Sequence, residues 1–262
     1  MTYDTIKLTL SDNVATLTIN RPEKLNALTP RVFEEMTAAI DAALAGGARA
    51  LVLTGEGRAF CSGADLMPDG YGYQGLPEDL GEVLDQYYNP FAQKLAGLDI
   101  PVVSAINGPA VGAGLGLALL GDISLAARSA YMLLAFVNIG LVPDAGATWV
   151  VAQSVGRAKA LEMALLGERI SAEDAANMGL ITRVVCDSQL QSEAYSIAKK
   201  LANGPTVAIS MIRKQVAAAL VENLDESLGT ESANQRRAGF TKDFREAVAA
   251  FAEKRPPRFK GE

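Results

Sequence analysis

Hydrophobic and polar positions alternate at the start of the chain and then recur at helical spacing. The runs 6–10 and 14–19 flank the turn residues Ser-Asp-Asn, which predicts a β-hairpin. Thr29-Pro30 then supplies an N-cap and a first-turn proline for a helix that Gly46-Gly47 ends. The apolar side chains of this helix are expected to share one face: Val32, Phe33, Met36, Ile40 and Leu44.

Short apolar runs typical of buried strands recur farther along the chain, at 50–54, 102–106, 123–126 and 181–185. Helical segments separate these runs, as in an α/β domain with crossover connections. From about Ser188 onward the pattern is helical only, with segments near 190–202, 205–221, 223–238 and 241–253. We therefore expect an α/β core over residues 1–187 and a helical region over residues 188–262.

The segment from Met67 to Leu80 is rich in Pro, Gly and Tyr. A connection of this length inside a compact domain is uncommon and is often functional. The segment is interpreted either as a lid or pocket wall, or as a plain surface loop.

The overall composition is that of a globular protein, with 262 residues of which 49% are hydrophobic and 21% charged. A net charge of −6 repels phosphate backbones, and the basic residues at Arg236-Arg237 and 254–260 are interleaved with acids or prolines, so no nucleic-acid partner is expected. The first residues lack the pattern of a signal peptide, and the apolar run 115–120 is too short to span a bilayer. A cytoplasmic protein without a membrane partner is therefore predicted.

The chain contains no histidine, which excludes Ser-His-Asp and Cys-His mechanisms and removes the usual imidazole base. Its two cysteines, Cys61 and Cys186, lack the spacing of metal ligands and are interpreted as small, reduced hydrophobic residues. No metal site is predicted. Carboxylates, tyrosines and backbone amides remain as candidate chemical groups.

The stretch 104–149 is poor in ionisable groups, since only Asp122, Arg128 and Asp144 carry charge there. Its glycines at 112, 114 and 116 give G-x-G-x-G, which does not match the dinucleotide-binding fingerprint. Two interpretations remain equally favoured. Either the glycines let a helix pack tightly against a strand, or a helix beginning near Ala113 points its free N–H groups at an anion.

A second candidate for backbone chemistry is the segment GEGRAFCSGADL at 55–66, which follows the predicted strand 50–54. Its small residues would let a ligand approach the main chain, and an amide there could converge with the amide near Ala113. Two such donors form an oxyanion hole, in which the loss of one donor typically costs about 10²–10³ in rate. Taken alone, the segment could equally be a structural loop.

Several motifs, in the right order, closely resemble the crotonase superfamily, also called the enoyl-CoA hydratase/isomerase superfamily. They are NRPEKLNAL (20–28), GRAFCSGADL (57–66), INGPAVGAG (106–114), GDISLAARSA (121–130), GLVPDAGAT (140–148) and the tail AFAEKRPPRF. The resemblance implies an α/β fold built as a spiral of ββα turns, a C-terminal helical trimerisation region, and a homotrimer or a hexamer of paired trimers. It also implies acyl-CoA thioesters as substrates, with coenzyme A as part of the substrate and no further cofactor.

The resemblance assigns site residues position by position. The oxyanion donors fall on the backbone N–H groups of Ser62 and Ala113. The CoA-binding positions fall on Lys24, near the CoA phosphates, and on the segment whose backbone contacts the adenine, which is Ala64, Asp65 and Leu66.

Departures from the family pattern indicate the type of reaction. Hydratases of this family hold their water between two glutamates, and the matching positions here are Gly116 and Phe136. Without that pair, hydration has no general acid and base. Asp144 remains, at a position where isomerases of the family carry their acid. The chain looks most like the isomerases of phenylacetate degradation, which act on ring-epoxidised phenylacetyl-CoA and shift enoyl double bonds.

Asp144 is therefore interpreted as the catalytic acid and base that moves a proton along an enolate. The alternative, an N-cap for a helix starting there, does not exclude this role. Phe136, Val137, Leu141 and Trp149 would keep water away, although each alone reads as a core residue. Three other functions stay open: an enoyl-CoA hydratase, another Asp-dependent crotonase reaction such as dienoyl-CoA isomerisation or C–C cleavage, and an acyl-CoA-binding protein without activity.

Overall fold

The computed structural model describes residues 2–67 and 77–262, so most of the predicted loop from Met67 to Leu80 lies outside the described residues. The strands are β1 (Ile6–Ser11), β2 (Val14–Ile19), β3 (Ala50–Gly55), β4 (Val102–Ile106), β5 (Ala110–Val111), β6 (Ile123–Ala127), β7 (Tyr131–Leu133), β8 (Ile170–Ser171) and β9 (Arg183–Val185). The α-helices are α1 (Pro30–Ala45), α2 (Leu80–Val83), α3 (Asn89–Gly97), α4 (Ala113–Leu119), α5 (Ala147–Leu166), α6 (Ala172–Asn177), α7 (Leu190–Ala202), α8 (Thr206–Ala219), α9 (Leu224–Gly239) and α10 (Lys242–Ala252). Short turns of other helix types are η1 (Pro22–Lys24), η2 (Leu84–Tyr88), η3 (Ala135–Ile139) and η4 (Asp187–Gln189).

The larger sheet has the order β1-β2-β3-β4-β6-β9, and only β1 runs antiparallel to its neighbour. The predicted hairpin is confirmed, because β1 pairs with β2 from Ile6↔Ile19 to Ser11↔Val14. Asp12 and Asn13 both have positive φ, as a two-residue turn between twisted strands requires. A smaller sheet has the order β5-β7-β8.

The helix predicted after Thr29-Pro30 is confirmed as α1. The Thr29 side chain caps it by accepting from the Val32 N–H, and four of the five apolar residues predicted on one face are buried against the sheet. Leu44 is the exception, since it is 37% exposed in the last turn. The strand predicted at 181–185 is also shorter than expected, because only Arg183–Val185 pairs with β6.

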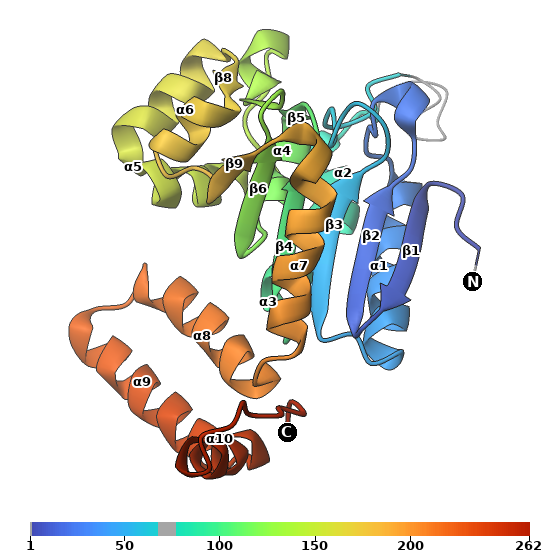
Figure 1. Ribbon diagram of the computed structural model, residues 1–262. Helices are drawn as coiled ribbons and strands as arrows, with labels where there is room; N and C mark the ends of the chain where they lie inside the picture. Colours follow the sequence, from blue (N-terminus) through green and yellow to red (C-terminus); the bar gives the residue numbers. More distant parts are fainter. Residues whose placement is uncertain (1, 68–76) are drawn as a thin grey trace.

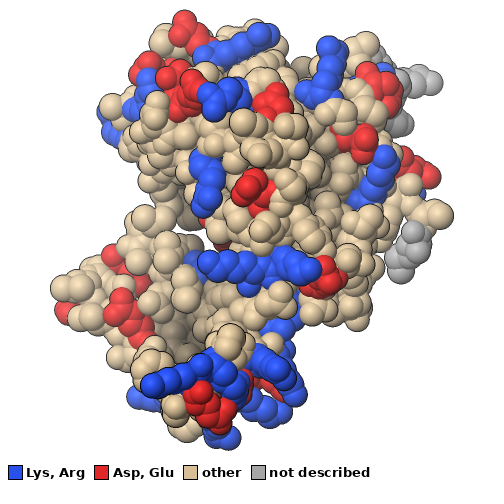
Figure 2. Space-filling model, viewed as in Figure 1, with Lys and Arg blue, Asp and Glu red and all other residues tan. Residues whose placement is uncertain are grey.

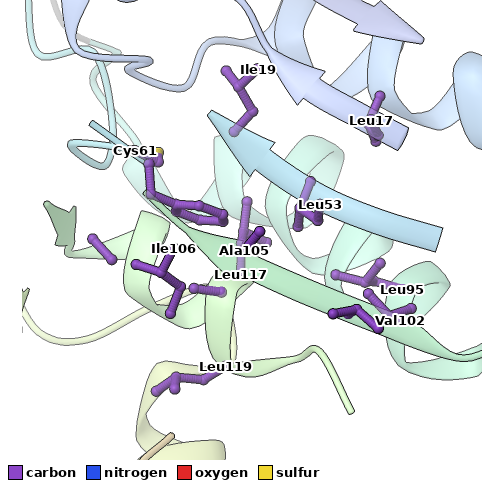
Figure 3. Close-up of a cluster of buried hydrophobic side chains, with 14 of the residues drawn as sticks. Leu17, Ile19, Leu53, Cys61, Leu95, Val102, Ala105, Ile106, Leu117 and Leu119 are labelled. Atoms are coloured by element: carbon purple, nitrogen blue, oxygen red, sulfur yellow. The ribbon is translucent and has the colours of Figure 1, made fainter. Parts of the chain in front are cut away.

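The core lies between the larger sheet and its covering helices, and Figure 3 shows Ile106 of β4 and Leu117 of α4 within it, with Cys61 at the edge of the same cluster. All seven residues of α4 are buried. A Cβ on Gly114 would lie 2.6 Å from the Cys61 carbonyl oxygen, so this glycine lets α4 pack tightly against the segment that contains Cys61. Tight packing, one of the two interpretations of the glycine run, is therefore confirmed at Gly114.

The C-terminal half of the helical region stands apart from the sheet. Figure 1 shows α7 lying across the sheet, while α8, α9 and α10 form a separate group. Polar contacts join α8 to the core: Arg213 pairs with Asp122 at 2.6 Å, and Lys214 pairs with Asp99 at 2.6 Å. The change in packing thus comes at α8, whereas the sequence pattern changes near Ser188.

Charged side chains on the C-terminal helices are intermixed in sign, as Figure 2 shows around α10. Arg255 pairs with Glu246 and Glu253, and Lys242 pairs with Glu262. Large apolar side chains are exposed on the same helices and at their C-caps, among them Ile212, Val216, Leu220, Leu224, Phe240, Phe244, Val248 and Phe251. Among the described residues, no helix combines the length and the apolar character that crossing a membrane requires.

Candidate active site

Backbone hydrogen bonds join the segments 25–28 and 61–66 at one side of the site. The Ser62 N–H donates to the Leu25 oxygen at 3.0 Å, the Leu28 N–H donates to the Gly63 oxygen at 2.8 Å, and the Asp65 N–H donates to the Leu28 oxygen at 2.9 Å. The Ala64 N–H lies between these bonds and has no acceptor among the described residues. Ala64 also lines a cavity. One backbone donor of the 61–66 segment is therefore free to meet a ligand there.

The N-terminus of α4 supplies a second free donor. Gly112 precedes it with φ 55° and ψ −128°, a conformation that glycine adopts readily, and the Ala113 N–H has no acceptor among the described residues. A Cβ built on Gly63 would lie 3.7 Å from the Ala113 nitrogen. The segment that carries the Ala64 N–H therefore passes directly beside the Ala113 N–H, and the predicted convergence of the two segments is observed.

The predicted donor at Ser62 is wrong. Its N–H is already bonded to the Leu25 oxygen, and its hydroxyl faces the Lys24 oxygen at 3.4 Å. In an extended segment, residues two apart direct their amides to the same side. The φ of 91° at Gly63 turns the chain between Ser62 and Ala64, so these two amides point in different directions. The free N–H therefore belongs to Ala64, two residues later than expected.

Asp144 lies in a tight turn between η3 and α5. Ala145 and Gly146 follow it with φ of 50° and 78°, and α5 begins at Ala147. The interpretation of Asp144 as an N-cap side chain is wrong, because Gly146 is the N-cap and α5 has no side-chain cap. Ala145 is buried in a left-handed conformation that is costly for alanine, and such strain is concentrated at functional sites.

One oxygen of the Asp144 carboxylate, Oδ1, is buried without a hydrogen-bond partner among the described residues. Burial raises the pKa of Asp144 from its ordinary value of 3.8 to about 6, because the charged form loses its water and gains little in return. A carboxyl group with this pKa can both accept and release a proton near neutral pH.

The same turn fills the space beside Gly116. A Cβ on Gly116 would lie 2.8 Å from the Ala145 oxygen and 3.4 Å from the Ala145 Cβ. A side chain at position 116 would therefore collide with backbone that cannot move without displacing Asp144. The position of the first hydratase glutamate is thus closed by the turn that presents the aspartate.

A cavity of about 530 Å³ is lined by both Ala64 and Asp144, whereas Ala113 lies beside the segment that carries Ala64 and outside this lining. Ala64 and Leu66 form one end, the turn from Leu141 to Gly146 forms another wall, and Thr148 and Trp149 continue it. The opposite wall comes from Leu80, Gly81, Val83, Leu84, Tyr88 and Asn89. Most of these side chains are apolar, so the cavity suits an apolar group that reaches Asp144.

Several predicted residues lie outside this lining. Asp65 is buried and pairs with Arg21 at 2.9 Å. Lys24 ends η1 beside the 61–66 segment. Phe136 is buried, and a Cβ on Gly112 would lie 3.6 Å from its ring, so it supports the backbone next to Ala113.

The expectation that Val137, Leu141 and Trp149 read as core residues is wrong, because all three are more than a third exposed. Leu141 and Trp149 line the cavity instead, whereas Val137 does not.

Sequence reasoning missed the wall formed by α2, η2 and α3. Residues 84–88 form a π-helix, a rare element that is frequent at functional sites. Its last residue, Tyr88, packs its ring on Phe33 at 4.4 Å between centroids. The next residue, Asn89, donates from its Nδ2 to the Asp85 Oδ1 at 3.0 Å.

The cysteines take no part in this chemistry. Burial raises the pKa of the Cys61 thiol to about 12, so it is not a nucleophile at neutral pH. Cys186 is likewise a free thiol, and it is exposed. Among the residues that the structure describes, no cluster of ionisable side chains has the arrangement of a metal site.

Comparisons with known proteins agree on one family. A family model described as enoyl-CoA hydratase/isomerase matches residues 9–262. The chain is 46% identical to a "Probable enoyl-CoA hydratase" of Rhodobacter capsulatus, with 100% of both chains covered. It is 43% identical to a "1,2-epoxyphenylacetyl-CoA isomerase" of Escherichia coli, with 95% of both covered. A crystal structure of an enoyl-CoA hydratase from Bacillus anthracis superposes with a TM-score of 0.92 at 30% identity, covering 99% of this chain and 100% of the other. The predicted fold is confirmed.

Proposed function

This chain belongs to the enoyl-CoA hydratase/isomerase family, the crotonase superfamily, and we propose that within it the chain is an acyl-CoA isomerase rather than a hydratase. One observation carries the proposal. Asp144, whose Oδ1 is buried and unpaired among the described residues, lines an apolar cavity together with Ala64, while the turn holding Asp144 closes the position of a hydratase glutamate.

The proposed mechanism uses two backbone donors and one carboxylate. A 3-enoyl thioester binds with its carbonyl oxygen at the N–H groups of Ala64 and Ala113. Asp144 takes a proton from the carbon next to the carbonyl, and the electron pair moves onto the oxygen to form a dienolate that both donors stabilise. Asp144 then returns the same proton to the fourth carbon, which leaves a conjugated 2-enoyl thioester. No atom is gained or lost, so no further cofactor is needed.

The apolar walls assist in two ways. They keep the pKa of Asp144 high enough for proton transfer in both directions. They also keep water from the dienolate, which suppresses hydration. A ring-epoxide CoA thioester is a second candidate substrate, favoured because a relative that is 43% identical carries the name of such an isomerase and the cavity admits an aromatic ring.

The direct test is isomerisation of a 3-enoyl-CoA, followed by the absorbance of the conjugated product. A ring-epoxidised phenylacetyl-CoA is tested beside it, with mass spectrometry of the products. Turnover of neither ester, with tight binding of both, would favour an acyl-CoA-binding protein without activity. Products with a broken C–C bond would favour a different aspartate-dependent reaction.

The pH dependence of the reaction follows from Asp144. Proton abstraction needs the ionised carboxylate, and its pKa is about 6. We therefore expect kcat/KM for isomerisation to rise about tenfold per pH unit below 6 and to level off above it. Initial rates between pH 4.5 and 8 measure this profile. An inflection near 4, the ordinary value for an aspartate, would contradict the proposed burial of the base in the free enzyme.

Hydration should be slow. Gly116 and Phe136 supply no carboxylate, so crotonyl-CoA is expected to be hydrated at a rate that Asp144→Asn does not change. Gly116→Glu should not restore the activity, because its Cβ would meet the Ala145 backbone. Loss of absorbance of the conjugated thioester gives the rate. Brisk hydration by the pure wild-type protein would defeat the proposal that this chain is an isomerase.

A trimer, or a hexamer of paired trimers, is the proposed assembly. Large apolar side chains of α8, α9 and α10 are exposed on the single chain, and their burial between subunits would favour this assembly. Light scattering at micromolar concentration should give at least three times the mass of the 27.6 kDa chain. A stable monomer would contradict this assembly. A cytoplasmic location and the absence of nucleic-acid and membrane partners remain predictions.

A further inference from the structure

An ion pair holds the 61–66 segment at Asp65, and neither of its residues lines the cavity. Arg21 and Asp65 join at 2.9 Å, and their side chains are only 16% and 4% exposed. A partly buried pair of this kind costs desolvation, and it contributes little to stability unless its remaining hydrogen-bonding groups are satisfied. Its place next to Ala64 therefore calls for an explanation.

The Arg21 guanidinium links the segments 25–28 and 61–66. Nη1 donates to the Ala27 oxygen at 2.7 Å, and Nη2 donates to the Asp65 carboxylate at 2.9 Å. The other carboxylate oxygen of Asp65 accepts from the Met67 N–H at 3.3 Å. One planar cation thus fixes the spacing between the 25–28 segment and the residue that directly follows Ala64.

The 25–28 segment is itself strained and tethered. Leu25 and Asn26 both have positive φ, at 51° and 57°. The buried Asn26 side chain holds this conformation, because its Oδ1 accepts from the Arg21 N–H and its Nδ2 donates to the oxygens of Glu56 and Ala59. Arg21 is therefore anchored at its backbone as well as at its guanidinium.

We propose that Arg21 and Asp65 are positioning residues that hold the Ala64 N–H in line with the substrate carbonyl. The inference rests on the proposed function, since it assigns a role to Ala64 in the oxyanion hole. The Ala64 amide is flanked by a carbonyl bonded to Leu28 and an amide bonded to Leu28, so its direction depends on the register of the two segments. Arg21 locks that register, because a shift of either segment would break one of its two bonds.

The test separates positioning from stability. Arg21→Gln should lower kcat for 3-enoyl-CoA isomerisation about 10- to 100-fold, because a misdirected donor loses most of its effect, while KM changes less than threefold. Arg21→Lys should recover part of kcat, since an ammonium can reach one of the two acceptors. The matched control is Arg31→Gln, which breaks a 2.9 Å pair with Glu35, a carboxylate as buried as Asp65, away from the cavity. It should lower the melting temperature and leave kcat intact.

A spectroscopic readout reports the donor directly. A cinnamoyl-CoA with an electron-donating para substituent absorbs at longer wavelength when its carbonyl oxygen accepts hydrogen bonds. The wild type and Arg31→Gln should show this red shift on binding, and Arg21→Gln should lose much of it. If Arg21→Gln does not fold, Asp65→Asn replaces it, since the amide keeps the size of the side chain and one acceptor oxygen.

The outcomes are distinct. Folded variants of Arg21 or Asp65 with an unchanged red shift and kcat overturn the positioning role, as does a loss confined to KM. A wild type that binds the probe without a red shift overturns the proposed oxyanion hole instead.

Discussion

Asp144→Asn should reduce isomerisation by several orders of magnitude and leave CoA-ester binding nearly unchanged. Asparagine has almost the same shape but cannot accept the proton, and no histidine exists in this chain to replace it. No other carboxylate lines the described part of the cavity. Single-turnover absorbance measures the chemical step. Binding is followed by the fluorescence of Trp149, the only tryptophan of the chain, which lies in the cavity wall.

The same substitution should stabilise the fold near neutral pH. The folded protein binds the Asp144 proton more tightly than the unfolded chain does, because the pKa rises from 3.8 to about 6 on folding. Stability from this group is therefore fully present below pH 3.8 and lost as the pH rises through 6. Asp144→Asn removes that loss, so its gain in melting temperature over the wild type should be larger at pH 8 than at pH 5.

Retained isomerisation in a folded Asp144→Asn protein would place the base elsewhere. Lower stability at pH 8 would mean that the carboxylate is better solvated or better paired than its surroundings indicate. The two measurements are independent, since one reports the reaction and the other reports the environment of the side chain.

The fold was largely predictable because its signals are local. The hairpin and α1 follow from alternation and from the Thr29-Pro30 cap, and buried parallel strands appear as continuous apolar runs. Leu44 departs because Ala43 occupies the buried side of the same helical turn. The packing boundary near α8 was not visible, because α7 and α8 are both amphipathic and only the tertiary structure shows which surface each one covers.

The site was predictable as a set of segments but not atom by atom. The family motifs led to Ala113 and Asp144, and the glycines gave the close approach of α4 to the Cys61 segment. The donor was misplaced at Ser62 because the sequence does not show which amide groups of an extended segment are already hydrogen-bonded to the neighbouring segment. That neighbour is 25–28, and its pairing with 62–65 has no periodic signature. The contact between Ala145 and Gly116 is likewise a property of the turn conformation.

Ala113→Pro should lower kcat for isomerisation about 10²–10³-fold or more while the protein stays folded. Ala113 is the first residue of α4, where proline is tolerated, and its N–H bonds to nothing else among the described residues. Gly112 has no Cβ to clash with the proline ring, and its φ of 55° and ψ of −128° mirror the extended conformation preferred before proline. The substitution removes one of two oxyanion donors, and its ring occupies the place of the oxygen.

Matched variants isolate the amide. Ala113→Gly keeps the N–H and should retain most of the activity. Ser62→Ala should also cost little, because the Ser62 N–H is bonded to the Leu25 oxygen and its hydroxyl faces the Lys24 oxygen at 3.4 Å. Circular dichroism and thermal melting come first, since loss of α4 would also abolish turnover. A folded Ala113→Pro enzyme with near-normal turnover would remove Ala113 from the oxyanion hole. An inactive Ser62→Ala enzyme would mean that the hydroxyl, rather than a backbone amide, meets the substrate on that side of the site.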